Sequence, residues 1–162
     1  MVDLFQTSHP IGKHDILALD IATTTGWAMH SASGVWKLTL KKDESKGMRL
    51  IRFRSKLVEL YSLHKFRLVV FEALAIYTKF PNFVAAEMQG VLKLFCTENN
   101  IDYKAYTVAE VKKFATGNGN ASKDKMIAAC RANYGVEPED DNHADALHVY
   151  HLALVDLMIS KL

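Results

Sequence analysis

The chain has 162 residues, of which 49% are hydrophobic and 23% are charged. This length and composition predict a single globular domain over residues 1–162, with residues 1–14 as a flexible or peripheral arm. No apolar run reaches membrane-spanning length, and the N-terminus lacks the basic-then-apolar order of a signal peptide, so the cytoplasm is the expected location.

The formal net charge of +2 hides a strong segregation along the sequence. Residues 37–67 contain ten basic and three acidic side chains. Residues 104–131 contain six basic and two acidic ones. Residues 136–156 contain six acids and no Lys or Arg. The basic stretches suit phosphate groups and the acidic end suits cations. Solvated helix faces that happen to be basic are the alternative explanation.

The first half of the chain predicts a β-meander, a helix and a buried strand. Apolar runs at 16–21, 26–30 and 35–40 are separated by the short breaks TTT and SASG. A helix with basic residues on one face is expected at 46–64, where apolar residues recur at helical spacing, namely Met48, Ile51, Leu57 and Leu60. The β-branched run at 67–76 suits a strand that is buried on both faces.

The second half predicts helices, with one short strand among them. In order, the elements are a helix at 82–98, a strand at 101–106 and helices at 108–115, 123–134 and 141–161. Thr107 and Glu110 have the spacing of a capping box, and Ser122 is the expected cap of the next helix. Cys96 and Cys130 lack zinc-site spacing and are expected as reduced core residues. The whole order predicts an α/β fold with a five-stranded mixed sheet and helices on both of its faces.

Two carboxylates occupy the same place on two predicted strands. Asp20 and Glu72 each lie near the C-terminal end of an apolar run, where an unpaired charge is costly to bury. If the two strands are neighbours, both acids meet at one edge of the sheet. Their mutual repulsion raises one pKa unless a divalent cation neutralises it, and hard oxygen ligands select Mg²⁺ or Mn²⁺.

A third acid stands near the start of the last predicted helix. Asp145 lies beside the apolar side of that helix, and Asp141 and Asn142 share roughly the same face. Taken singly, a strand-end Asp is commonly a turn residue, and an Asp near a helix start commonly stabilises the helix dipole. Three acids that converge on one edge favour a metal site instead.

These motifs together resemble the RuvC-like Holliday-junction resolvases of the ribonuclease H superfamily, including phage-type members. LALDIATTTGWAM is similar to the first strand of that family, LVVFE to its second acidic strand and DNHADALHVYHLA to its closing helix. VKKFATGNGNASKDKM is similar to its basic segment. The resemblance runs from residue 16 to residue 153. It implies a ribonuclease H-like fold in the cytoplasm of a bacterium or a phage-infected host cell.

The resemblance also implies an activity and the residues that perform it. The expected enzyme is a crossover junction endodeoxyribonuclease that makes paired symmetric nicks with two Mg²⁺ or Mn²⁺ ions and leaves 5′-phosphate and 3′-hydroxyl ends. Asp20, Glu72 and Asp145 would be metal ligands, and Lys112 and Lys123 would lie beside the scissile phosphate or along the DNA backbone. The family usually has a fourth ligand where this chain has Asn142, so Asn142, Asp141 or His143 would complete the site.

Other residues are expected to contact DNA or a second subunit. Tyr77 and Phe80, in the loop after Glu72, are candidates for the aromatic residue that the family places at the junction centre; packing between helices is the alternative for both. The expected contacts with the DNA backbone come from the basic helix and its neighbours, at Arg49, Arg52, Lys79, Lys112, Lys113, Lys123 and Lys125. The resemblance implies a homodimer, with the helix at 82–98 as the candidate interface.

Three alternative functions remain open at this stage. LDIATTTG also resembles the phosphate-binding turn of actin-like ATPases, although such proteins normally contain two copies of the domain. A nuclease of the same fold that cuts flaps, other branched DNA or RNA/DNA hybrids would share the same ligands. A module that binds junctions with weak cleavage is compatible with Asn142.

Overall fold

The computed structural model describes residues 9–75, 78–80 and 82–159. Five strands form one sheet in the order β3-β2-β1-β4-β5. The strands are β1 (Ile16–Asp20), β2 (Thr24–Ala28), β3 (Ser33–Lys37), β4 (Leu68–Glu72) and β5 (Asp102–Tyr106). The meander β1-β2-β3 is antiparallel, whereas β1, β4 and β5 are parallel to one another. The predicted mixed sheet is confirmed.

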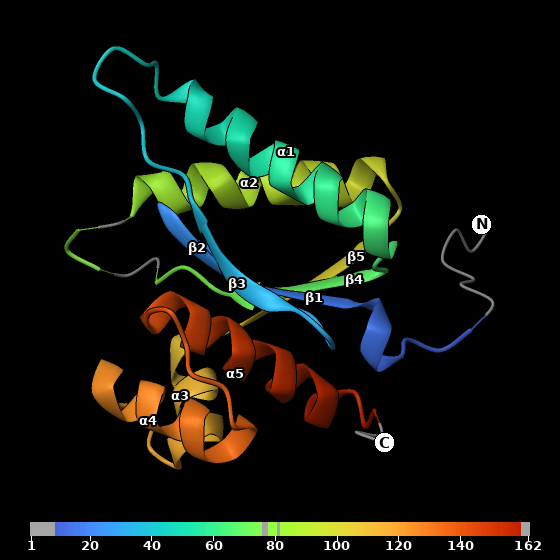
Figure 1. Ribbon diagram of the computed structural model, residues 1–162, viewed down its shortest axis with the longest axis vertical. Helices are drawn as coiled ribbons and strands as arrows, with labels where there is room; N and C mark the ends of the chain where they lie inside the picture. The colour runs from blue at the N-terminus through green and yellow to red at the C-terminus, as the bar shows by residue number, and fades with distance from the viewer. Residues whose placement is uncertain (1–8, 76–77, 81, 160–162) are drawn as a thin grey trace.

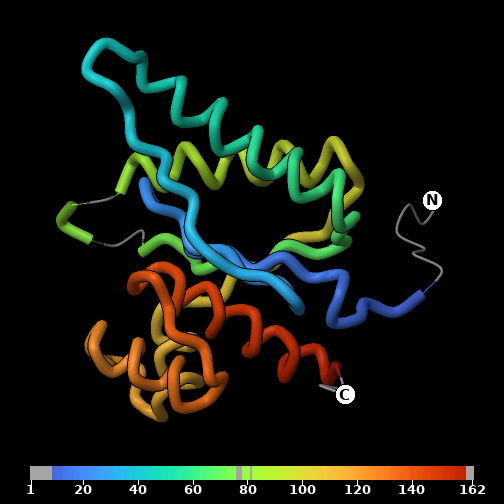
Figure 2. Tube along the Cα trace, in the orientation of Figure 1, coloured from blue at the N-terminus to red at the C-terminus, as the bar shows by residue number. Residues whose placement is uncertain are grey.

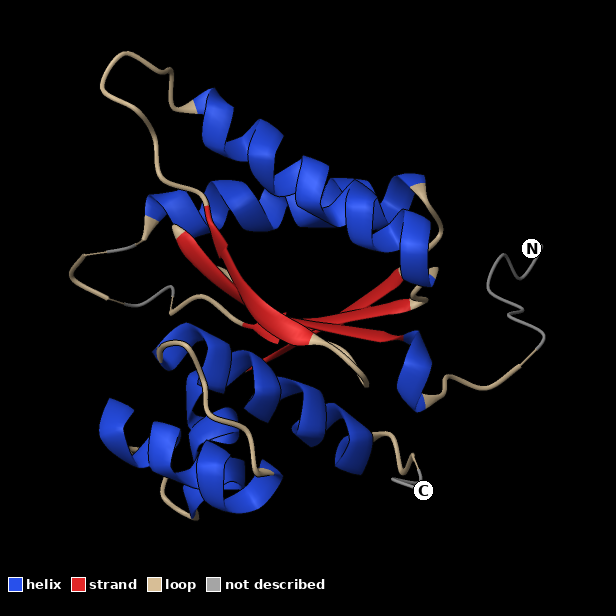
Figure 3. Ribbon diagram, in the orientation of Figure 1, coloured by secondary structure: helices blue, strands red, loops and turns tan. Residues whose placement is uncertain are grey.

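Helices cover both faces of this sheet (Figures 1 and 3). On one face lie α1 (Gly47–His64) and α2 (Phe83–Glu98), and on the other lie α3 (Val108–Thr116), α4 (Lys123–Tyr134) and α5 (Asp141–Asp156). A short 3-10 turn, η1 (Lys13–Asp15), precedes β1 and was not predicted. The described ends of the chain lie on the same side of the molecule (Figure 2). Within the described ranges, no helix is long and apolar enough to cross a bilayer.

The strands β1 and β4 separate two hydrophobic cores. In β1, Ile16 and Ala18 join the core under α3, α4 and α5, whereas Leu17 and Leu19 join the core under α1 and α2. The same alternation along β4 follows from the two-residue period of a strand. Because both faces of β1 and β4 are buried, apolar residues follow one another along these strands instead of alternating with polar ones. Cys96 and Cys130 are free and buried, as predicted.

Several element boundaries differ from the sequence-based prediction. The β2–β3 hairpin lies about two residues earlier than predicted, because the turn in which Met29 N–H donates to the Ala32 carbonyl ends β2 at Ala28. The last helix ends at Asp156 rather than near residue 161, since Met158 adopts a left-handed φ of 53°. Ile51 was predicted on the buried side of α1 but is 58% exposed, and Phe53 is buried there instead.

The described part of the N-terminal arm is bound to the domain. The Arg67 guanidinium donates to the His9 carbonyl at 2.6 Å, and the Tyr150 hydroxyl donates to the Lys13 carbonyl at 2.9 Å. Residues 9–14 therefore run along the surface as a peripheral segment, held by Arg67 just before β4 and by Tyr150 of α5.

A fully buried histidine joins α4 to α5. The Nε2 atom of His148 lies 2.8 Å from the Met126 carbonyl and its Nδ1 lies 2.9 Å from the Tyr134 hydroxyl. Because a carbonyl only accepts, Nε2 carries the hydrogen and Nδ1 accepts from Tyr134. One imidazole thus contacts both ends of α4 and fixes this helix on α5.

This histidine predicts a pH dependence of stability. Burial lowers the pKa of His148, so near pH 6.5 the unfolded chain binds a proton that the folded protein does not bind. The contribution of His148 to the free energy of unfolding therefore falls as pH decreases from 7.5 to 5.5, by up to about 1.4 kcal/mol per pH unit for one proton. In urea denaturation, His148→Gln should be less stable than the wild type at pH 8, and this difference in the free energy of unfolding should narrow as pH decreases, because the acids contribute equally to both proteins. Parallel slopes would contradict this.

Candidate active site

The alternation along β1 and β4 places two acids on the same face of the sheet. Because Ile16 and Ala18 face α5, Asp20 at the end of β1 faces it as well. Leu68 and Val70 face α5 in the parallel neighbour β4, and Glu72 continues that series. The strands are aligned so that Leu19 pairs with Phe71, immediately before the two acids. The two strands that end in an acid, β1 and β4, are therefore neighbours, which is the condition set out in the sequence analysis.

The N-terminal end of α5 lies directly on this edge of the sheet. Its N-cap Asp140 accepts from the His143 backbone N–H at 2.8 Å, which fixes where the helix begins. Gly26, which pairs with Asp20 across β1 and β2, faces the first turn of α5. A Cβ built on Gly26 would lie 1.9 Å from the Asn142 carbonyl oxygen. Only glycine permits this approach, which brings Asp145 toward the two strand-end acids.

Burial raises the pKa of all three acids, and repulsion adds to this rise for Asp20 and Asp145. The pKa of Asp20 is raised well above its usual range by burial first and then by Glu72, Asp145, Asp141 and Asp140. Burial also raises the pKa of Glu72. The pKa of Asp145 is raised to about 7, first by burial and then by Glu72 and Asp141. The three carboxyl groups therefore form one electrostatically coupled acidic site.

Two lysines face the acidic site from α3 and α4. The positive charges of Lys112 and Lys123 oppose the rise in the pKa of Asp145. The Lys123 ammonium also lies 2.7 Å from an Asp141 carboxylate oxygen, although Lys123 itself is 82% exposed. These lysines offset only part of the negative charge, since the pKa values of the acids remain raised.

The donor set fits a hard divalent cation. Among the described residues, the buried Oδ1 atom of Asp145 has no hydrogen-bond partner. Such an atom is costly to bury, and a cation at this point would satisfy it while relieving the repulsion among the acids. The donors are all oxygens, which Mg²⁺ and Mn²⁺ prefer. Within the described ranges, no three His, Cys, Asp or Glu side chains lie close enough together to hold a metal ion as they stand.

The candidates for a fourth ligand differ in their contacts. Both ring nitrogens of His143 are engaged, with Nδ1 accepting from the Glu139 backbone N–H at 3.0 Å and Nε2 lying 2.8 Å from the Ser33 hydroxyl. Its ring therefore points to β3 rather than to the acids. Asn142 lies over Gly26, and Asp141 is paired with Lys123. Of the three candidates, only the His143 side chain is thus turned to β3.

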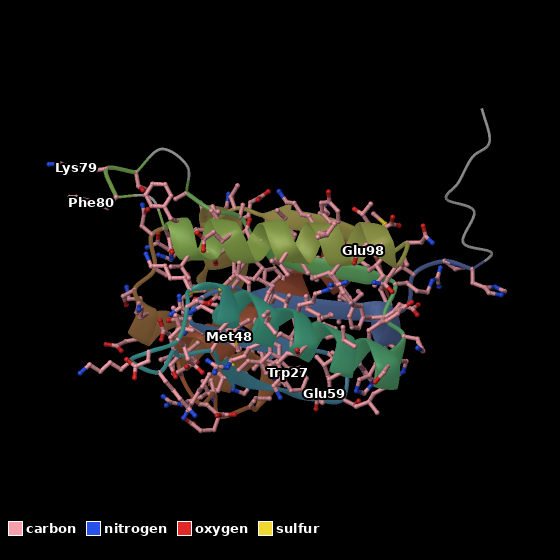
Figure 4. The ribbon with its side chains drawn as sticks, turned by 90° about the horizontal axis from the view of Figure 1, so that it is seen from above. Trp27, Met48, Glu59, Lys79, Phe80 and Glu98 are labelled. Carbon is pink, nitrogen blue, oxygen red and sulfur yellow. The ribbon has the colours of Figure 1, made fainter. Side chains whose placement is uncertain are left out.

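The predicted DNA-contacting residues fall into two groups. Lys113 and Lys125 are exposed, and Lys79 and Phe80 project from the loop before α2 (Figure 4). Tyr77 lies outside the described residues. By contrast, Arg49 donates to the Leu38 carbonyl at 3.1 Å, and Arg52 forms an ion pair with Glu44. These two arginines hold the β3–α1 loop against α1.

Gly26 is the functional residue that the sequence analysis missed. The sequence placed it in a strand, and an isolated glycine within a strand pattern signals a close approach by another backbone. That signal was present in TTTGWA, but only the fold shows that the approaching backbone belongs to the start of α5.

The family model described as "Crossover junction endodeoxyribonuclease RuvC" matches residues 30–152. The chain belongs to the RuvC family. The matched range contains Glu72 and Asp145 but begins after Asp20, so the place of Asp20 in the site rests on the sheet geometry. The RuvC family is one of metal-dependent nucleases. An actin-like ATPase is therefore excluded.

Curated relatives carry the same family name. The RuvC of Brachyspira hyodysenteriae is 42% identical over 64 residues, which is 40% of each chain. The RuvC of Caldicellulosiruptor saccharolyticus is 32% identical over 107 residues, or 64% of each chain. The matches thus span less than two thirds of these relatives.

Solved RuvC structures share the fold over most of the chain. Thermus thermophilus RuvC superposes with a TM-score of 0.69 at 18% identity, covering 88% of this chain and 95% of that one. The same protein in complex with Holliday junction substrate gives a TM-score of 0.71 at 20% identity, covering 88% and 94%. The predicted ribonuclease H-like fold is confirmed.

The close approach at Gly26 predicts a large effect of one methyl group. Gly26→Ala must push α5 away from β2, and we expect a loss of about 1 to 3 kcal/mol in the free energy of unfolding. Gly34→Ala is the matched control in the same hairpin, because its Cβ meets only side-chain atoms at 3.3 Å or more. Urea denaturation of both variants tests this. Equal losses would contradict the special role of Gly26.

The repulsion among the acids predicts that removing one of them stabilises the fold. In EDTA at pH 8 the acids repel most strongly, and Asp145→Asn should raise the free energy of unfolding by about 1 to 2 kcal/mol. Added Mg²⁺ should stabilise the wild type more than this variant. Asp156→Asn on the same helix is the control and should be destabilised, because Asp156 accepts hydrogen bonds from Lys104 and Tyr106. A destabilised Asp145→Asn would refute the prediction.

Proposed function

We propose that this protein is a metal-dependent, structure-selective DNA endonuclease that resolves four-way junctions by paired symmetric nicks. The observation that carries the proposal is the acidic site, in which Asp20, Glu72 and Asp145 come from two parallel strands and one helix. Membership of the RuvC family supports the choice of substrate, since the relatives are named crossover junction endodeoxyribonucleases.

The acids would hold two Mg²⁺ or Mn²⁺ ions, with Asn142 or Asp141 completing the ligand set. When bound, such ions lower the pKa of an attacking water and stabilise a leaving 3′ oxygen, so that a 5′-phosphate and a 3′-hydroxyl result. The protein contributes a partly buried, preorganised set of oxygens whose charge is already unfavourable without a cation. This arrangement favours occupancy of the site.

Lysines around the site would bind and stabilise the phosphate. Lys112 and Lys123 already act electrostatically on Asp145, and they would offset the negative charge that builds up on the phosphate in the transition state. Lys113 and Lys125, on the same two helices, would bind the DNA backbone without reading its sequence. Binding would therefore weaken steeply with salt.

The loop after Glu72 would contact the centre of the junction. Phe80 is 82% exposed, and the Lys79 ammonium lies 5.8 Å from its ring centroid. An exposed aromatic ring beside a cation suits stacking on an unpaired base next to a phosphate backbone. Of the two aromatic candidates, Phe80 lies within the described residues, and Tyr77 remains the other candidate.

The outer face of α2 supports a homodimer. Exposed residues recur along it at helical spacing, namely Phe83, Ala86, Gly90, Leu94 and Thr97. Phe83 and Leu94 are 72% and 55% exposed, and Gly90 between them has open space around a built Cβ. Small residues flanked by large apolar ones permit close packing of two helices across a two-fold axis. The helices α1 and α2 form the outer layer on this side (Figure 4).

The proposed activity predicts selective, metal-dependent nicking. With Mg²⁺, the wild type should nick a mobile four-way junction symmetrically and leave a duplex and a flap largely intact. Asp20→Asn should reduce cleavage by about 100- to 1000-fold while junction binding persists. Asp43→Asn, at an exposed acid of the β3–α1 loop, is the control.

Other outcomes identify the alternatives. Cleavage of flaps or RNA/DNA hybrids as efficient as that of junctions would favour a broader nuclease on this fold. Junction binding by the wild type without any nicking would favour a binding module.

The α2 interface predicts that a large side chain at Gly90 separates the subunits. A Cβ built on Gly90 has no atom within 4 Å, and the residue is exposed, so circular dichroism of Gly90→Arg should report an intact fold. Analytical ultracentrifugation should show monomers for this variant and dimers for the wild type. Gly47→Arg, at an exposed glycine that begins α1, is the matched control and should remain dimeric. A dimeric Gly90→Arg would place the interface elsewhere.

A further inference from the structure

A cavity of about 740 Å³ lies away from the acidic site, at the other end of β1. Its walls come from four parts of the chain: Lys13 in η1, the β2–β3 turn, the end of α4 with the following segment, and the second half of α5. In Figure 1 the blue turn η1 lies near the C-terminal end of α5. Asp20, Glu72 and Asp145 do not line the cavity. Its volume is in the range of small-molecule sites.

The polar groups of the cavity favour an anion. Lys13, His30 and His151 line it, together with Ser31, Ser33 and Asn133, and no Asp or Glu is among the lining residues. His14 adds a further imidazole, since its ring meets that of His30 edge-on at 4.3 Å. The pKa of His30 is lowered by burial and then by the charges of Lys13 and His14, which is the effect of a positive surrounding.

One wall of the cavity offers flat aromatic surface. The rings of Tyr134 and His151 are stacked with centroids 3.8 Å apart and planes inclined by 8°. Tyr150 meets His151 edge-on at 5.3 Å. Met29, Leu147 and Leu154 supply apolar surface beside these rings. An anion with a planar ring system would therefore contact both chemistries at once.

Hydrogen bonds hold the walls in place before any ligand binds. The Tyr150 hydroxyl fixes η1 to α5 through the Lys13 carbonyl, and Ser33 is fixed to α5 through His143. The turn at residues 29–32 is closed by its own backbone hydrogen bond at 2.8 Å. A preformed cavity loses little entropy when it is filled.

We propose that this cavity binds a nucleoside 5′-monophosphate group, with the phosphate near Lys13 and His30 and the base against the Tyr134 and His151 rings. Two sources share this chemistry: a free nucleotide and the 5′-phosphorylated end of a DNA strand. The site is separate from the acidic site and does not depend on the nuclease function proposed above.

The test is isothermal titration calorimetry of the full chain with dTMP in EDTA. Thymidine lacks the phosphate of dTMP, and inorganic phosphate lacks its base and sugar. Both should bind at least about tenfold more weakly than dTMP. Lys13→Gln and His30→Gln should each weaken dTMP binding by about tenfold. Lys42→Gln, at an exposed lysine outside the cavity, is the control for loss of one charge and should bind as the wild type does. Asp20→Asn should also bind dTMP normally, which separates this site from the acidic one.

Two further measurements locate the ligand and its source. In amide NMR spectra, dTMP should shift the signals of Ser31, Ala32 and Tyr134 in preference to those around Asp20. A trinucleotide with a 5′-phosphate that displaces dTMP, when its 5′-hydroxyl counterpart does not, would assign the site to DNA ends; a lack of displacement by both would assign it to free nucleotides. No binding of dTMP at millimolar concentration, equal binding of phosphate alone, or unchanged binding by both cavity variants would overturn the proposal.

Discussion

The contact between the start of α5 and the strands β1 and β2 is the constraint on which the candidate site depends. At Gly26 the backbone of the helix touches the backbone of the strand, and no side chain separates them. The helix begins at a fixed residue because Asp140 caps it, and its acids are then presented to the ends of β1 and β4. Without this approach, Asp145 would stand apart from Asp20 and Glu72.

This contact also creates an electrostatic cost. Burial raises the pKa values of Asp20, Glu72 and Asp145, repulsion adds to the rise for Asp20 and Asp145, and two lysines offset only part of that charge. The two hydrophobic cores on either side of the sheet stabilise the fold against this cost. A destabilised, charged site within a well-packed framework is typical of a functional centre rather than a structural ion pair.

The two faces of the sheet differ in their chemistry. The helices α3, α4 and α5 carry Lys112, Lys123 and Asp145 on the face to which Asp20 and Glu72 also point, and His148 fixes α4 to α5 so that Lys123 remains near Asp141. The helices α1 and α2 carry no residue of the acidic site and expose apolar side chains instead. Under the proposed function, this separation would leave one face for the substrate and the other for a second subunit.

Local chemistry along the sequence was sufficient to predict the element order, the capping box at Thr107 and the three acids, because caps and periodic apolar residues act over a few neighbours. The placement of Asp20 and Glu72 at the same edge of the sheet followed from their equivalent positions on two neighbouring strands. Three features were beyond such patterns. The turn at residues 29–32 shifted the hairpin, His143 turned to Ser33 on β3, and Arg49 and Arg52 bound the β3–α1 loop.

These outcomes depend on partners that are distant in the chain. Gly26 and Asn142 are more than a hundred residues apart, as are Ser33 and His143, and no local pattern specifies which of them will meet. The sequence by itself determined which residues carry charge, which strands are buried on both faces and where most helices begin. The tertiary structure decided which acids face the same side of the sheet, which basic side chains are already engaged and where the cavity beside η1 lies, because each depends on packing between distant elements.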